Sequence, residues 1–71
     1  MKDREELLVS LIFDEQTEYS INISEYIEEI YKYDRFIEDV KSILKKSKVT
    51  IIRESIDLDK NGPIWIIKVK K

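Results

Sequence analysis

The sequence predicts an α+β domain in which a single four-stranded mixed β-sheet carries one long helix on one face. Four segments have the apolar patterns of strands, and one segment, residues 24–46, has apolar residues at helical spacing. The two most apolar strand segments stand near the two ends of the chain. A chain of 71 residues is long enough for one small domain, so residues 1–71 are predicted to form a single unit with residues 1–6 frayed.

Residues 7–13 and 18–23 are predicted to form a β-hairpin. Six of the seven residues in the first segment are apolar, which is typical of a central strand buried on both faces. The second segment alternates, with Tyr19, Ile21 and Ile23 on one face, as expected for a half-buried strand near an edge.

Residues 24–46 have the strongest periodicity in the chain. Ser24 is a good N-cap, acidic residues crowd the start of the segment and lysines crowd its end, as the helix dipole favours. No Gly or Pro interrupts the segment, so one helix of about six turns is predicted. The apolar stripe of this helix consists of Tyr26, Ile30, Tyr33, Ile37, Val40 and Leu44.

Residues 48–58 and 64–70 are predicted to be the last two strands. The polar run 53–55 interrupts the first of them and indicates a bulge or an edge position. Asp57 to Gly62 matches the first six positions of an EF-hand calcium loop, but the twelfth position is Lys68, where the loop needs a bidentate Glu. A hairpin turn, with no metal, is therefore predicted at residues 59–62.

The predicted order of elements is β-β-α-β-β. The first and last strands are the most apolar, so they are expected side by side and parallel in the middle of the sheet, joined through a right-handed crossover. This order resembles the β-grasp architecture of ubiquitin-like and immunoglobulin-binding bacterial domains. The resemblance lies in the element order alone, without a residue motif, and it implies a fold but no function.

The composition excludes most catalytic chemistry. The chain has no Cys, no His and one Gly, which removes thiol and histidine nucleophile systems, zinc sites of the usual kind and Gly-rich phosphate loops. Acid–base catalysis by carboxylates is the enzymatic alternative, but no pair of carboxylates stands out. We therefore expect a protein that is not an enzyme and that has no cofactor and no metal site.

A surplus of apolar strand residues predicts association. If Trp65, Ile67 and Val69 face the helix, Ile64 and Ile66 face away from it, and one helix leaves the second face of the sheet uncovered. The preferred function is therefore a small binding module acting through protein–protein contacts, as a homodimer formed through this uncovered face or with another protein as the partner. The residues predicted for the interface are Leu8, Ile12, Ile51, Ile64 and Ile66.

The alternative function is nucleic-acid binding through the second half of the chain. Residues 1–40 contain 12 acidic and 4 basic residues, a net charge of −8, whereas residues 41–71 contain 9 basic and 3 acidic residues, a net charge of +6. A localised basic patch can bind phosphates even when the whole chain is acidic. The residues predicted for this contact are Lys45, Lys46, Lys48, Lys68 and Lys70.

The start of the chain mixes acidic and basic residues, and no long apolar run follows it. Neither a signal peptide nor a membrane-spanning segment is therefore predicted, and the expected location is the cytoplasm, without a membrane contact.

Overall fold

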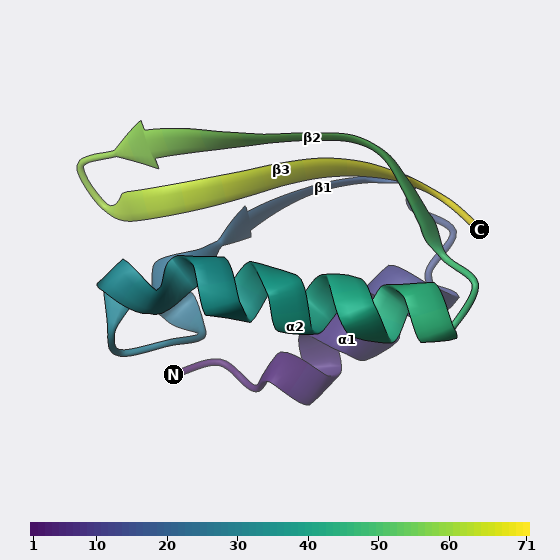
Figure 1. Ribbon diagram of the computed structural model, residues 1–71, viewed down its shortest axis with the longest axis horizontal. Coiled ribbons are helices and arrows are strands. Elements are labelled where there is room, and N and C mark those ends of the chain that lie inside the picture. The colour runs from purple at the N-terminus through teal and green to yellow at the C-terminus, as the bar shows by residue number, and fades with distance from the viewer.

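The computed structural model describes residues 1–71 and places two helices on one face of a three-stranded antiparallel sheet (Figure 1). The predicted four-stranded mixed sheet with one long helix, in a β-grasp-like order, is therefore wrong, although the α+β class is right. In chain order the elements are α1 (Arg4–Phe13), β1 (Glu18–Asn22), the short 3-10 helices η1 (Ile23–Glu25) and η2 (Ile30–Lys32), α2 (Tyr33–Lys46), β2 (Thr50–Asp59) and β3 (Gly62–Lys70).

The first predicted strand is the helix α1. Asp3 is its N-cap, and the Asp3 carboxylate accepts a hydrogen bond from the backbone N–H of Glu5 at 2.9 Å. Leu7 and Leu11, one helical turn apart, are buried, while Phe13 is 76% exposed. The cap and this spacing make the segment helical, although its apolar content is that of a central strand.

The predicted long helix is interrupted, and only its second half forms α2. A continuous helix over residues 24–46 would be about 34 Å long, whereas the longest dimension of the whole molecule is 31 Å. Such a helix would also place the like charges of Glu25 and Glu29 four residues apart on one face. In the structure Glu25 instead pairs with Lys2 at 2.5 Å and Glu29 pairs with Lys32 at 2.5 Å.

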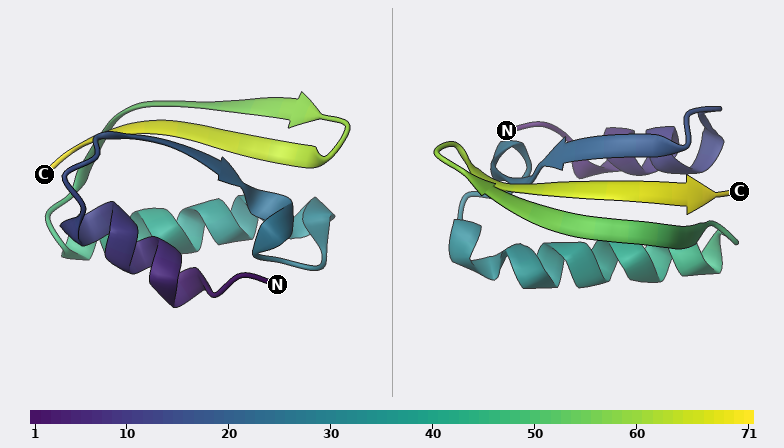
Figure 2. Two further views of the ribbon diagram at one scale, coloured as in Figure 1. Left: turned by 180° about the vertical axis from the view of Figure 1, so that it is seen from behind. Right: turned by 90° about the horizontal axis from the view of Figure 1, so that it is seen from above.

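The sheet has the order β1-β3-β2, with the C-terminal strand in the centre (Figure 2). β3 pairs antiparallel with both neighbours, so the predicted parallel pairing of the first and last apolar segments is wrong. The three strands predicted at residues 18–23, 48–58 and 64–70 are confirmed within a few residues. The turn at residues 59–62 is also confirmed, and Gly62 adopts a φ of +108°, a conformation that favours glycine.

The core lies between the sheet and the two helices. Trp65 on β3 is fully buried at its centre, yet its indole Nε1–H has no hydrogen-bond partner. Alternation along β3 turns Trp65, Ile67 and Val69 towards the helices and Ile64 and Ile66 away from them. The twelve buried hydrophobic residues are Leu7, Leu11, Ile21, Ile23, Phe36, Ile37, Val40, Leu44, Val49, Trp65, Ile67 and Val69.

Candidate functional site

The outer face of the sheet is mostly polar, which changes the predicted interface. Ile66 lies between Ser20 of β1 and Ser55 of β2 in the strand register. Ile64 lies in the same way between Asn22 of β1 and Asp57 of β2. Lys68 and Lys70 continue this face along β3. Only two of the five predicted interface residues, Ile64 and Ile66, therefore lie on the uncovered face.

The other three predicted interface residues lie on the covered side of the sheet. Leu8 and Ile12 belong to α1, and both are partly buried against the core. Ile51 pairs with the buried Val69, so it also faces the helices. The structure does not bring the five residues together, because the segment predicted to add apolar surface to the sheet is a helix that covers it.

The five lysines predicted for nucleic-acid contact gather at one end of the molecule. The backbone N–H of Lys48 donates to the carbonyl of Lys45 at 3.2 Å, in the turn that leads from α2 to β2. Thr50, at the start of β2, lies opposite Lys70 near the C-terminus (Figure 1). Only Lys68 has an ion pair, with Glu18 at 3.8 Å. Lys46 completes the set at the end of α2.

The free edge of β2 is the feature that the sequence prediction missed as a contact site. β2 borders the sheet, and nine of its ten residues are exposed. Its large apolar side chains Ile52, Ile56 and Leu58 are 55%, 41% and 80% exposed. Natural edge strands are usually protected by Lys or Pro, and the segment Thr50–Asp59 contains neither. Its protection consists of the bulge between Ile51 and Arg53 and of four charged residues, Arg53, Glu54, Asp57 and Asp59.

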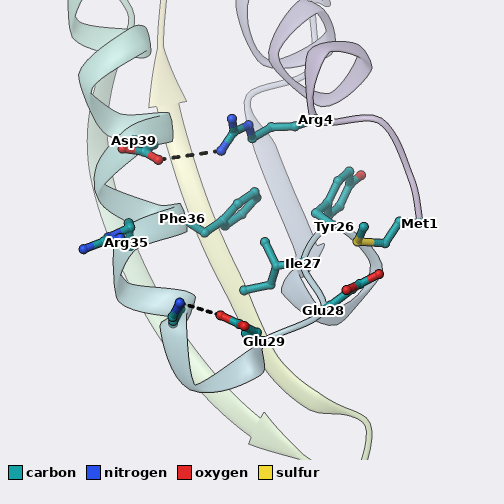
Figure 3. Close-up of a pocket in the computed structure, with 10 residues that line it drawn as sticks. Met1, Arg4, Tyr26, Ile27, Glu28, Glu29, Arg35, Phe36 and Asp39 are labelled. Atoms are coloured by element: carbon teal, nitrogen blue, oxygen red, sulfur yellow. Dashed lines mark ion pairs between the residues drawn. The ribbon is translucent and has the colours of Figure 1, made fainter.

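Two grooves flank α2. The first, of about 580 Å³, lies between the N-terminal segment, the loop after η1 and the first half of α2 (Figure 3). Tyr26 and Phe36 stack in it with ring centroids 5.9 Å apart, and Arg4 pairs with Asp39 at 3.6 Å. The second groove, of about 640 Å³, lies between the end of α2 and the start of β2, with Lys45 and residues 51–53 among its lining.

The N-terminal segment that borders the first groove is held by Glu25. The backbone N–H of Lys2 donates to the Glu25 carbonyl at 2.7 Å, and the Lys2 ammonium lies 2.5 Å from the Glu25 carboxylate. The hydrogen bond to this carboxylate, together with its charge, raises the pKa of Lys2 above its ordinary value. This contact joins the start of the chain to η1, and in the groove itself Arg4 is paired with Asp39 and Lys32 with Glu29.

The described features of the surface are the free edge of β2, the lysine cluster and the two grooves. No group of three or more Asp or Glu side chains is placed to hold a metal ion. Neither helix of the structure has the length and apolar composition needed to cross a membrane. In comparisons with known proteins, no family model matches the sequence, and no curated protein and no solved structure shows significant similarity to it.

Proposed function

We propose that this protein is a small non-enzymatic binding module that acts through protein–protein contacts and forms a homodimer through the free edge of β2. The observation that carries the proposal is the exposure of this edge: nine of ten residues of β2 are exposed, on a strand with an unpaired side. An exposed strand edge presents a row of unpaired backbone N–H and C=O groups that a strand of another chain can pair with.

The side chains of β2 support the same conclusion. Leu58 and Ile56 lie opposite Pro63 and Trp65 of β3, which places them on the helix side of the sheet. The helices nevertheless leave them 80% and 41% exposed, because the hairpin end of β2 is the part of the sheet farthest from α2 (Figure 1). Burying such side chains against a partner contributes roughly 25 cal/mol for each Å² of apolar surface removed from water.

The substitution Leu58→Lys is expected to abolish the dimer without unfolding the domain. A lysine on an edge strand opposes pairing by another strand, and a side chain as exposed as Leu58 contributes little to the fold of the monomer. Light scattering over a dilution series measures the effect. The series starts at about 1 mM, where an association of about −4 kcal/mol is half complete.

Phe13→Lys is the matched control, because Phe13 is 76% exposed on α1, away from β2. This variant should dimerise like the unmodified protein. A monomer at every concentration of the unmodified protein contradicts the proposal, and so does a Leu58→Lys variant that remains fully dimeric.

Nucleic-acid binding is the second candidate, and the gathering of the lysines at one end of the molecule favours it. Lys45, Lys46 and Lys48 at the end of α2 adjoin the end of β3 that carries Lys68 and Lys70. Such a cluster can neutralise consecutive phosphates. The outer face of the sheet carries no aromatic side chain for stacking on bases, so the contact would be to the backbone of the nucleic acid, without sequence preference.

The double substitution Lys45→Gln with Lys46→Gln is expected to weaken such binding and to reduce its salt dependence. Losing two phosphate contacts lowers the slope of log affinity against log salt by about 1.5. Fluorescence anisotropy with a labelled single-stranded RNA and a DNA duplex at several salt concentrations gives this slope. The control is Lys2→Gln with Lys32→Gln, outside the cluster and in ion pairs. The absence of binding at low salt eliminates this candidate.

A further inference from the structure

Two charges on the outer side of β2 have no partner in their own chain. Arg53 lies opposite Lys68 of β3, and like charges placed directly opposite each other destabilise a sheet. None of the ion pairs of the structure includes Arg53. Asp57, four residues further along the same side, lies opposite Ile64 and is also absent from these ion pairs. The strand therefore carries one unpaired positive and one unpaired negative charge on one face.

We propose that a second copy of this chain pairs antiparallel with β2 in the register centred on Ser55, so that Arg53 of each copy faces Asp57 of the other. This inference rests on the proposed function and names the partner strand and its alignment. The pairing joins the two sheets into one of six strands with the two β2 strands in the middle. It also supplies Arg53 with the carboxylate that its own chain lacks.

The backbone allows a partner strand at these positions. Pro63, which has no N–H, lies opposite Leu58. Leu58 and Pro63 therefore cannot form a hydrogen-bonded pair, so the backbone N–H and C=O of Leu58 point to the free edge. Because these directions alternate along a strand, the N–H and C=O of Ile56 and Glu54 also point to the free edge. Figure 2 shows that β2 is the strand beside α2, where Lys41 pairs with Glu54 at 2.6 Å, and that the hairpin half of β2 turns away from this helix. A strand added at the hairpin half is therefore farther from α2 than one added at the start of β2.

The alternative registers of the two β2 strands are less favourable, because they bring like charges together or use a carboxylate that already accepts a hydrogen bond. Two residues that lie directly opposite each other in an antiparallel pair point to the same face of the sheet. The alternative registers are therefore those in which opposite residues still share a face. Centring the pair on Glu54 or on Asp57 would oppose two identical carboxylates. Centring it on Ile56 would place Arg53 opposite Asp59, whose carboxylate already accepts the Lys60 N–H at 2.6 Å. Only the register centred on Ser55 uses both unpaired charges.

The same register also buries apolar side chains. It brings Leu58 of the second copy to the level of Ile52, the extra residue of the bulge, which is 55% exposed and lines the groove between β2 and the end of α2. Leu58 itself is 80% exposed in the single chain. The two equivalent contacts of the dimer therefore cover the four most exposed apolar side chains of the paired strands.

The substitution Ser55→Cys tests the centre of the pairing. The protein has no cysteine, so this variant carries a single thiol. In the proposed dimer the two Ser55 positions form a non-hydrogen-bonded pair with Cα atoms about 4.5 Å apart, within the range that a disulfide spans. Under mild oxidation we expect a disulfide-linked dimer to form at least about tenfold faster than in Ser20→Cys, because facing thiols have a high effective concentration.

Ser20→Cys is the control because Ser20 lies on the same outer face but on β1, at the opposite edge of the sheet. Equal rates of disulfide formation for the two variants overturn the proposed register.

Charge exchange tests the two ion pairs. Arg53→Asp alone and Asp57→Arg alone should each weaken the dimer about tenfold, because each replaces two attractive contacts with two repulsive ones. The variant with both substitutions should recover most of the affinity. Arg53→Asp also removes the repulsion from Lys68 within the chain, so its thermal midpoint as a monomer should not fall.

The outcomes separate the register from the proposed function. A dimer that Leu58→Lys dissociates, but in which the charge variants have no effect and Ser55→Cys is not linked faster than its control, overturns the register alone. A protein that is monomeric at every concentration overturns both.

Discussion

Replacing Trp65 with alanine is expected to lower the free energy of unfolding by about 3–5 kcal/mol. Trp65 is fully buried in the central strand and lies between Ile21 and Ile56 in the register. Truncating a buried Trp costs about 3–5 kcal/mol. A domain of this length has a total stability of roughly 4–10 kcal/mol, so the loss removes a large part of it. Urea unfolding followed by far-ultraviolet circular dichroism measures the change.

The control for this prediction is Tyr31→Ala, because Tyr31 is an aromatic residue that is 76% exposed. Its unfolding midpoint should stay close to that of the unmodified protein. Trp65→Phe should be less destabilising than Trp65→Ala, since it keeps a ring and removes a buried N–H that has no partner. A Trp65→Ala variant with an unchanged midpoint would show that Trp65 is not at the centre of the core.

Leu11→Ala is the second substitution with a large expected effect. Compared with Phe13→Ala, it shows whether this segment is a helix or a strand. Leu11 is fully buried, so its truncation is expected to cost about 2–5 kcal/mol. Phe13 is 76% exposed, so Phe13→Ala is expected to cost less than about 0.5 kcal/mol. Comparing the urea midpoints of the two variants gives the result.

The two substitutions are expected to differ because side-chain directions repeat every 3.6 residues in a helix and every two residues in a strand. In a strand Leu11 and Phe13 point to the same face, and both truncations would be costly. In a helix they lie about 200° apart around the axis, and only the residue that faces the core matters. Equal and large losses for both variants would therefore favour the strand that the apolar content predicts.

The segment at residues 7–13 shows why apolar content alone misleads. Its run of apolar residues is compatible with a buried strand and with a helix, because short apolar runs have no unique period. The signals for a helix were present just before it: Asp3 followed three residues later by Glu6 is a capping pattern, and Leu7 and Leu11 stand one turn apart. The packing of α1 beside α2 against the sheet then settles the choice.

The error at residues 24–46 has a different cause. The periodicity of the second half is real, and α2 buries Phe36, Ile37, Val40 and Leu44 as the apolar stripe predicts in large part. The first half shares this periodicity but breaks into η1 and η2, where Glu25 pairs with Lys2 and Glu29 pairs with Lys32 instead of facing each other one helical turn apart. The pairing of Glu25 with Lys2 joins segments that are distant in the chain, which local sequence does not report.

The candidate site could likewise be predicted only in part from the sequence. Alternation along β3 predicted correctly that Ile64 and Ile66 point away from the helices and that Trp65 points towards them. The clustering of the five lysines was also anticipated from their place in the second half of the chain. The polar run 53–55 indicated an edge or a bulge in this strand, and β2 has both. The exposure of Ile56 and Leu58 on the helix side of β2 could not be anticipated in the same way, because it depends on where α2 lies.

The sequence by itself determined the three strands, the hairpin turn with its one glycine, the second half of the helix and the exclusion of cysteine and histidine chemistry. These properties are local, since they depend on periodicity, turn residues and composition within a few positions. Only the tertiary structure decided that residues 4–13 are a helix, that β3 is antiparallel to both of its neighbours, and that the helix predicted at residues 24–46 is interrupted. Those choices depend on burying one shared core, and the energy of a shared core belongs to contacts between segments that are distant in the chain.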